Sequence, residues 1–334
     1  MTWLVADVGG TNARFALVEN GSTEISQIIS LPTSDYASLE QAAEDYLSRI
    51  DAIGSLSGAC FALACPVHQL PIQMTNLDWM IAPENLAKAL NISAEKVLLI
   101  NDFTAQAMAM VSLPENEFIK LSGSTTATPA NQQQQLPQLV VGPGTGLGVA
   151  GLIPGESGSW QVLATEGGHI SYAVQHADEL PVLEWFQQRH GRVSVERLLC
   201  GDGLLALYEF EAFVAGVESV CNSPAQVSEM AENGNATAVR AVDRFLSILG
   251  STVGDLTLAL GAWGGVNLCG GILPKMSGWV DWQSFHENFG KKGRYSAAVS
   301  TVPVRLCMAS QPGLVGTAAW MAQAQAELTP AIHK

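Results

Sequence analysis

The fold is decided by the stretch Leu4-Val5-Ala6-Asp7-Val8-Gly9-Gly10-Thr11-Asn12-Ala13-Arg14-Phe15-Ala16-Leu17-Val18. Its two apolar runs around a glycine turn predict a strand, a tight hairpin and a second strand. Backbone N–H groups gathered in such a turn form a concave site for anions such as phosphate. Asp7 would repel a phosphate unless a cation lay between them, so the pair indicates a metal–nucleotide complex. The alternative, a plain hairpin with Asp7 facing water, stays open on this segment alone.

The composition predicts two globular domains and argues against a nucleic-acid partner. The chain has 334 residues, of which 48% are hydrophobic, and a formal net charge of −15. This length exceeds that of one typical domain, and the negative charge would repel nucleic acid. No basic segment followed by an apolar one begins the sequence, so we expect no signal peptide.

The cysteines predict reduced, buried thiols in a cytoplasmic protein. None forms a C-x-x-C pair, and most have apolar neighbours, which disfavours a disulfide framework. The six are Cys60, Cys65, Cys200, Cys221, Cys269 and Cys307.

One uncharged stretch, Leu256 to Leu273, has the length of a membrane span. Its five glycines and Asn267 instead divide it into a helical piece and a buried strand. We therefore interpret it as a core segment and expect no association with a membrane.

The remaining periodicities predict alternating strands and helices, and hence an α/β protein with a mixed sheet. Ser38 and Gln41 form a capping box at the start of one helix. The expected strands are Gln27–Ser30, Ala59–Ala64, Lys96–Ile100 and Val266–Cys269. The expected helices are Ser38–Arg49, Pro83–Leu90, Thr104–Val111, Glu184–Gln188, Ala225–Gly261 with a break near Glu232–Asn235, and Gly313–Leu328.

A second glycine turn, Gly144-Thr145-Gly146 within Leu139–Ile153, repeats the pattern of the opening hairpin. The repeat predicts two related α/β halves, each presenting a glycine turn to one cleft. Neither turn fits a P-loop, because no Gly-Lys-Ser/Thr occurs, or a dinucleotide fingerprint, because a strand follows. The polar segment Ser122–Pro137 before the second turn is expected to be a solvated loop.

Two groups of polar residues are candidates for chemistry. Asn101 and Asp102 follow a buried strand, where ligands bind in open α/β sheets, although Asp102 could equally cap the next helix. Glu166 and His169 flank a Gly-Gly bend, from which both could reach the hydroxyls of one sugar or a metal ion. No cysteine cluster follows His169, which argues against structural zinc.

For two further features an ordinary structural explanation is available. Glu196, taken alone, is expected to be a solvated helix residue. Gly270-Gly271 follows a buried strand, where the bare backbone could receive a flat base or permit tight packing.

Taken in order, these motifs resemble those of the bacterial glucokinases of the proteobacterial type, over residues 3 to 320. Met74-Thr75-Asn76 with Trp79 is also similar to this family. The related ROK kinases carry zinc-binding cysteines after the Glu-Gly-Gly-His motif, whereas here no cysteine occurs until Cys200. The resemblance implies a two-domain α/β protein of the hexokinase/actin-like (ribonuclease H-like) fold, with duplicated mixed sheets flanked by helices. It also implies a small domain of residues 1–110 plus 311–330, a large domain of residues 111–310, and an active site in the interdomain cleft.

The activity implied by the resemblance is ATP-dependent phosphorylation of the 6-hydroxyl of glucose, giving glucose 6-phosphate and ADP. Asp102 would be the general base, and Asp7 would position Mg²⁺ through water. The implied glucose-binding residues are Asn101, Asp102, Glu166, His169 and Glu196. The implied ATP-binding residues are Ala6, Asp7, Val8, Gly9, Gly10, Thr11, Asn12, Gly144, Thr145, Gly146, Gly270 and Gly271.

The resemblance further implies a homodimer. Three alternatives stay open: a kinase of another hexose such as mannose or an amino sugar, a sugar-sensing regulator without catalysis, and a chaperone- or actin-like ATPase. A regulator would need a DNA-binding helix pair, and an ATPase would have no use for the Glu-Gly-Gly-His constellation.

Overall fold

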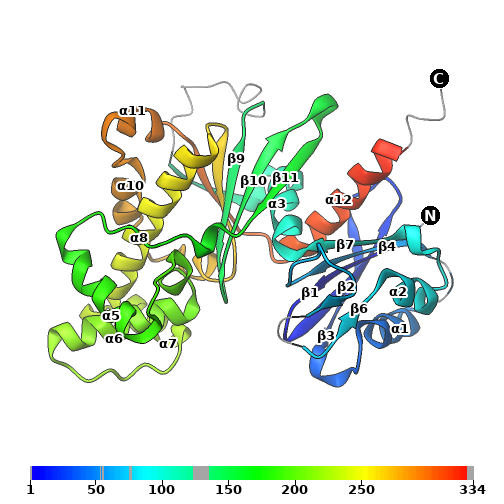
Figure 1. The fold of residues 1–334 in the computed structure, drawn as a ribbon, viewed down its shortest axis with the longest axis horizontal. Coiled ribbons are helices and arrows are strands. Elements are labelled where there is room, and N and C mark those ends of the chain that lie inside the picture. Colours follow the sequence, from blue (N-terminus) through cyan, green and yellow to red (C-terminus); the bar gives the residue numbers. More distant parts are fainter. Residues whose placement is uncertain (1, 53, 55, 75–76, 123–134, 329–334) are drawn as a thin grey trace. The chain divides into compact units, whose positions relative to one another are not determined.

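The computed structural model describes residues 2–52, 54, 56–74, 77–122 and 135–328 (Figure 1). The chain forms two compact units, Met1–Glu115 with Ala309–Lys334, and Asn116–Met308. Most of the expected solvated loop, residues 123–134, lies outside the described residues, as do Thr75 and Asn76.

The first unit is built on a mixed five-stranded sheet with the order β3-β2-β1-β4-β7. The strands are β1 (Thr2–Val8), β2 (Asn12–Glu19), β3 (Ile25–Pro32), β4 (Leu56–Leu63) and β7 (Val97–Asn101). The first three form an antiparallel meander, and β4 and β7 are added in parallel to β1 and β4. The predicted opening hairpin, third strand and mixed sheet are confirmed.

The second unit repeats this topology in the order β11-β10-β9-β12-β13-β8. Its strands are β8 (Phe118–Ser122), β9 (Gln138–Pro143), β10 (Leu147–Pro154), β11 (Trp160–Thr165), β12 (Gly265–Leu268) and β13 (Val304–Cys307). Here too an antiparallel meander, β9 to β11, is followed by two parallel strands, with β8 added at the edge. The two predicted α/β halves are therefore confirmed.

Helices cover both faces of the first sheet because its central strands are apolar on both sides. Side chains of β1 alternate between two cores, Leu4, Ala6 and Val8 in one, and Trp3 and Val5 in the other. The helices are α1 (Leu39–Arg49), α2 (Pro83–Leu90), α3 (Asp102–Ser112) and α12 (Pro312–Leu328), with a short ribbon of β5 (Ile72–Gln73) and β6 (Met80–Ile81). Helices α1 and α2 contribute to the first core, and α3 and α12, which pack against each other, to the second (Figure 1).

Ser38 caps α1 as predicted, whereas the Gln41 side chain bonds to the residue before the cap instead of to Ser38 itself. Ser38 is its N-cap and accepts the N–H of Gln41 at 3.4 Å, while Gln41 Oε1 accepts the N–H of Ala37 at 3.1 Å. The bond to Ser38 satisfies one N–H group that the first helical turn leaves without a partner, and the bond from Ala37 ties the preceding chain to the same turn.

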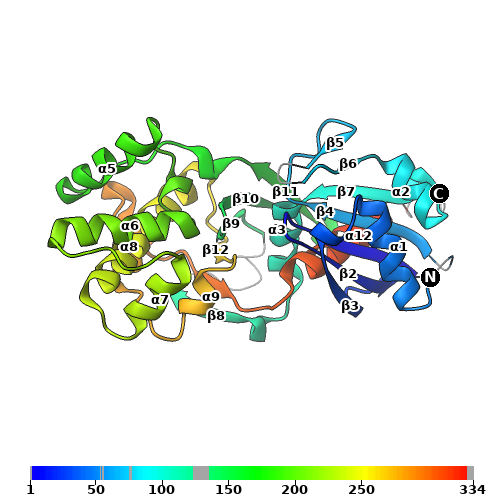
Figure 2. The same cartoon turned by 90° about the horizontal axis from the view of Figure 1, so that it is seen from below.

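One large core fills the second unit between its sheet and its helices. The helices are α5 (Leu180–His190), α6 (Gly201–Ala215), α7 (Pro224–Glu232), α8 (Ala236–Leu260), α9 (Leu273–Met276), α10 (Gln283–Gly290) and α11 (Ser296–Val299). Helices α6, α7 and α8 lie side by side (Figure 2). The uncharged stretch Leu256 to Leu273 is divided between α8 and β12, as predicted, and no described helix is long and apolar enough to cross a membrane.

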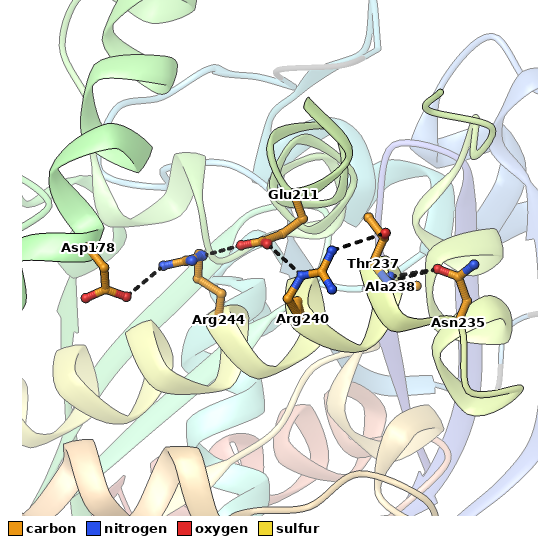
Figure 3. A network of polar contacts seen from close by, with 7 residues as sticks. All are labelled: Asp178, Glu211, Asn235, Thr237, Ala238, Arg240 and Arg244. Carbon is orange, nitrogen blue, oxygen red and sulfur yellow. Dashed lines mark hydrogen bonds and ion pairs between the residues drawn. The ribbon is translucent and has the colours of Figure 1, made fainter. Parts of the chain in front are cut away.

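An ionic network joins α6 to α8 (Figure 3). Glu211, whose side chain is 4% exposed, accepts Nε of Arg240 at 3.1 Å and Nε of Arg244 at 2.7 Å. Arg244 also reaches Asp178 at 3.5 Å, at the turn that precedes α5. Pairing with two guanidinium groups offsets the cost of burying the carboxylate.

The cysteines are as predicted. All six are buried, and none forms a disulfide.

Candidate active site

The first glycine turn has the hydrogen-bonding pattern of an anion cradle. Gly9 N–H donates to Asn12 O at 2.9 Å, while Thr33 donates its hydroxyl to Gly10 O at 2.9 Å and its N–H to Thr11 O at 3.0 Å. The N–H groups of Gly10 and Thr11 have no acceptor among the described residues. The carbonyl oxygens of the turn are thus occupied as acceptors, while two N–H donors remain, as anion binding requires. Thr33 was not among the predicted site residues.

The second glycine turn is closed by different hydrogen bonds but shares one feature with the first. Gly144 N–H donates to Gly146 O at 2.8 Å, and Gly144 O accepts the N–H of Gly201 at 2.9 Å. In the described part of the chain, no acceptor takes the N–H groups of Thr145 and Gly146. Both halves of the duplication thus present two amide donors at the tip of their first hairpin.

The loop after β12 lies directly beside this second turn. Gly270 has a φ of +83°, and a Cβ there would stand 2.4 Å from Pro143 O, so tight packing accounts for this glycine. Gly271 is different, because no atom lies within 4 Å of a Cβ built on it. Its own N lies 3.9 Å from the Cβ position of Gly144, so the structure brings these two predicted ATP-binding segments together.

Asp7 is mostly buried at the end of β1, so the alternative in which it faces water is wrong. Its side chain is 17% exposed, and its Oδ2 lies 3.3 Å from Nη1 of Arg14. Burial raises the pKa of Asp7, and the positive charge of Arg14 opposes that rise. Arg14 was not among the predicted site residues, although the hairpin register pairs it directly with Asp7.

Asn101, rather than Asp102, is the N-cap of α3. Its Oδ1 accepts the N–H groups of Phe103 at 3.0 Å and Thr104 at 3.3 Å, and its Nδ2 donates to Cys65 O at 3.3 Å. Asp102 is the first residue of the helix, and its Oδ1 accepts the Phe103 N–H at 2.8 Å. Asp102 is therefore not the N-cap, although it shares the N–H of Phe103 with Asn101.

Asp102 has the electrostatics of a base. Burial raises its pKa to about 6, with the negative charge of Asp7 as the second cause, while the N–H groups of Phe103 and of Asp102 itself lower it. A carboxyl group with this pKa is ionised at neutral pH and is a better proton acceptor than an ordinary aspartate.

Glu166 precedes a short 3₁₀ turn, Gly167–His169, and His169 is the last residue of that turn. Their side chains are 77% and 57% exposed, and Oε2 of Glu166 lies 3.9 Å from Nε2 of His169. Arg192, which sequence analysis missed, donates to the carbonyl oxygen of His169 at 2.7 Å and fixes the bend. The two polar side chains thus extend from a hydrogen-bonded bend and are open to a ligand.

Glu196 is brought to His169 by local chain pairing. Val195 N–H donates to Ile170 O at 3.0 Å, which places the 3₁₀ turn Val195–Arg197 beside the bend. Oε1 of Glu196 lies 3.6 Å from Nδ1 of His169, and Oε2 accepts the N–H of Leu147 at 2.9 Å. The interpretation of Glu196 as a solvated helix residue is therefore wrong.

Each unit accordingly gathers one set of candidate residues. The first contains a glycine turn, Asp7, Asn101 and Asp102, and the second contains a glycine turn, Gly270–Gly271 and the three hexose candidates. Within the described ranges, no three His, Cys, Asp or Glu residues cluster as a metal site. A single carboxylate such as Asp7, together with phosphate oxygens and water, is nevertheless a common environment for Mg²⁺.

Comparison with known proteins agrees with these features. The family model described as Glucokinase matches residues 4–324. The chain is 44% identical to the glucokinase of Chromohalobacter salexigens over 94% of this chain and 95% of that one, and 41% identical to the glucokinase of Marinobacter nauticus over the same shares. The crystal structure of a glucokinase from an Antarctic psychrotroph is similar with a TM-score of 0.83 and 34% identity, covering 96% of this chain and 99% of that one.

Proposed function

The chain belongs to the glucokinase family and is an enzyme that phosphorylates glucose with ATP, and we propose that Asp102 is its general base. The observation that carries this proposal is a half-buried carboxylate, with its pKa raised to about 6, at the carboxyl end of β7. Ligands bind at this end of the strands in open α/β sheets.

In the proposed reaction Asp102 accepts the proton of the glucose 6-hydroxyl as its oxygen attacks the γ-phosphorus of ATP. The new O6–phosphorus bond forms while the bond from phosphorus to the β–γ bridging oxygen breaks, and ADP leaves. Phosphoryl transfer depends mostly on positioning and on stabilising charge, so one base is sufficient to orient the nucleophile.

The two glycine turns are proposed to bind the ATP phosphates. Their four N–H groups, on Gly10, Thr11, Thr145 and Gly146, are available as donors among the described residues. The segments Ala6–Asn12 and Gly144–Gly146 would contact the phosphates, and Gly270–Gly271 the adenosine. Asp7 would hold Mg²⁺ through water, and the cation would neutralise phosphate charge.

The hexose hydroxyls are proposed to bind Asn101, Glu166, His169 and Glu196, together with Asp102. The exposed Glu166 and His169 side chains can reorient toward a ligand, whereas Asn101 already uses its oxygen as a helix cap. A site built from such groups discriminates strongly against a sugar that lacks the matching hydroxyl. A coupled assay with ATP and a panel of hexoses tests this selectivity, and mannose or an amino sugar phosphorylated as efficiently as glucose would contradict it.

Replacing the base tests the mechanism directly. We expect Asp102→Asn to fold, to bind glucose and to lose about 10²–10⁴-fold in kcat, because it cannot accept the proton. Glu84→Gln is the matched control, since Glu84 is an exposed acid in the first turn of α2. Wild-type turnover in Asp102→Asn would remove this residue from the mechanism, whereas Glu84→Gln should retain full kcat.

Several finer assignments belong to the same proposal. We infer a cytoplasmic homodimer with a small domain of residues 1–110 plus 311–330 and a large domain of residues 111–310. The burial of all six cysteines outside any disulfide, together with the use of ATP, supports a reducing compartment. The net charge of −15 argues against a nucleic-acid partner, because the phosphate backbone is also negative. Sedimentation equilibrium of the purified chain tests the dimer.

A further inference from the structure

One carboxylate touches groups assigned to two different ligands. Oε2 of Glu196 accepts the N–H of Leu147 at 2.9 Å, and Oε1 lies 3.6 Å from Nδ1 of His169. Leu147 is the first residue of β10 and directly follows the second glycine turn. Thr145 at the tip of this turn and Glu196 also line the same cavity, of about 150 Å³. Glu196 therefore connects the phosphate-binding turn to the hexose-binding bend.

The turn is shaped to admit this carboxylate. A Cβ on Gly146 would stand 2.6 Å from Oε2 of Glu196, although the φ of Gly146 lies outside the left-handed region. The backbone conformation at position 146 would thus accept other residue types, and the side chain of Glu196 is what excludes them. At the other end of the turn, a Cβ on Gly144 would have only Gly271 N within 4 Å, at 3.9 Å.

The peptide of Leu147 is also packed against the hexose-binding bend. A Cβ on Gly168 would stand 2.2 Å from the carbonyl oxygen of Leu147, so the bend lies directly on this residue. Leu147 itself is 5% exposed and belongs to the core of the second unit. Its position therefore influences both the direction of the turn's N–H groups and the placement of Glu166 and His169.

We propose that Glu196 is a positioning residue that couples hexose binding to nucleotide binding, an inference that rests on the proposed function. Without hexose, its negative charge lies beside the turn that receives phosphate, and like charges repel. A hexose hydroxyl that donates to Glu196 disperses part of this charge and fixes the carboxylate on Leu147. Nucleotide then binds more tightly to the sugar-loaded enzyme, and by reciprocity sugar binds more tightly to the nucleotide-loaded enzyme.

Calorimetry of the magnesium complex of adenylyl imidodiphosphate, with and without saturating glucose, tests this coupling. In the wild type we expect glucose to lower the Kd of the analogue about 5-fold or more, the ordinary range for coupled sites. Glu196→Gln keeps an oxygen for Leu147 but removes the charge. Its ratio of Kd values should fall toward one, chiefly because the analogue binds more tightly without glucose.

Gly146→Ala is the second variant, since the added Cβ displaces the carboxylate while leaving it in the protein. It should also lower the ratio. Glu166→Gln is the matched control, because Glu166 is a hexose candidate whose side chain is 77% exposed and has no bond to Leu147 in the described structure. Glu166→Gln should weaken glucose binding, but at saturating glucose it should keep the wild-type ratio of Kd values for the analogue.

The outcomes separate this inference from the proposed function. A wild-type ratio of Kd values in both Glu196→Gln and Gly146→Ala would overturn the coupling. Equal Kd values with and without glucose in the wild type would overturn it as well. A purely structural role would lower the melting temperature and kcat while keeping the ratio, and so would also overturn it. Wild-type glucose affinity in both Glu166→Gln and Glu196→Gln would instead contradict the hexose assignment.

Discussion

The carboxylate of Asp7 lies where a side chain on Gly313 would have to stand. A Cβ on Gly313 would be 2.7 Å from Oδ2 and 2.8 Å from Cγ of Asp7. Gly313 is the second residue of α12, so the beginning of this helix packs directly against the end of β1. The C-terminal helix thereby helps to set the position of the carboxylate proposed to hold Mg²⁺.

Gly313→Ala should consequently destabilise the protein and reduce its activity. The new methyl group must displace Asp7 or α12, and overpacking of this kind costs about 1–3 kcal/mol. Thermal unfolding and kcat measure the two effects. Gly278→Ala is the control, because nothing lies within 4 Å of a Cβ there and its φ is outside the left-handed region. Equal behaviour of the two variants would show that the contact with Asp7 has no consequence.

The pH dependence should report the base. Because Asp102 acts in its ionised form and burial raises its pKa to about 6, kcat/KM for glucose should be level near neutral pH and fall below about pH 6. The fall approaches tenfold per pH unit when a single proton is responsible. Steady-state rates between pH 4.5 and pH 8 measure it. A profile that stays level through the acid range would contradict the assignment.

Asp7 should influence the pKa of Asp102 directly. The negative charge of Asp7 is the second cause of the raised pKa, so Asp7→Asn should lower it toward the ordinary aspartate value. Carbon-13 NMR of the Asp102 carboxyl group, in protein without metal, follows this titration independently of activity. Asp35→Asn, which removes an exposed charge, should leave the pKa in place. An unshifted titration in Asp7→Asn would show that the two carboxylates do not interact.

The network around Glu211 should contribute to the stability of the second unit. Glu211→Gln removes the charge that two guanidinium groups share, and Arg240 and Arg244, which are 47% and 21% exposed, can then turn to solvent. We expect a loss of about 1–3 kcal/mol, less than for a fully buried pair. Denaturant unfolding measures it.

Glu209→Gln provides the comparison on the same helix. Glu209 pairs with Arg189 at 3.4 Å, and both side chains are more than a third exposed. An exposed pair contributes about 0–1 kcal/mol. If Glu211→Gln cost no more than Glu209→Gln, the buried network would have no special role.

Local patterns were sufficient to predict the elements that carry the site. Both hairpins, the strand that ends at Asn101 and the bend at Glu166–His169 are defined by residues within a few positions of one another, where turn chemistry and apolar periodicity act. The direct pairing of Asp7 with Arg14 could also have been derived, because it follows from the register of one hairpin.

Long-range contacts could not be predicted in this way. Glu196 reaches Leu147, and Gly313 reaches Asp7, only because tertiary packing joins segments far apart in the chain. No periodicity or spacing in the sequence encodes these distances. The sequence also left open whether Asp102 is a functional residue or the cap of the next helix, since aspartate suits both positions, and the structure shows that Asn101 is the N-cap of α3.

The return of the chain to its first unit has a consequence for biosynthesis. One face of the first sheet, with Trp3, Val5 and Cys60, is covered in part by Leu314 and Met321 of α12. A ribosome makes this face first and its cover only after every residue of the second unit. We therefore expect the second unit to fold during translation, as domains generally do. The first unit would meanwhile expose an apolar strand surface, which is the kind of site that chaperones bind, until α12 emerges.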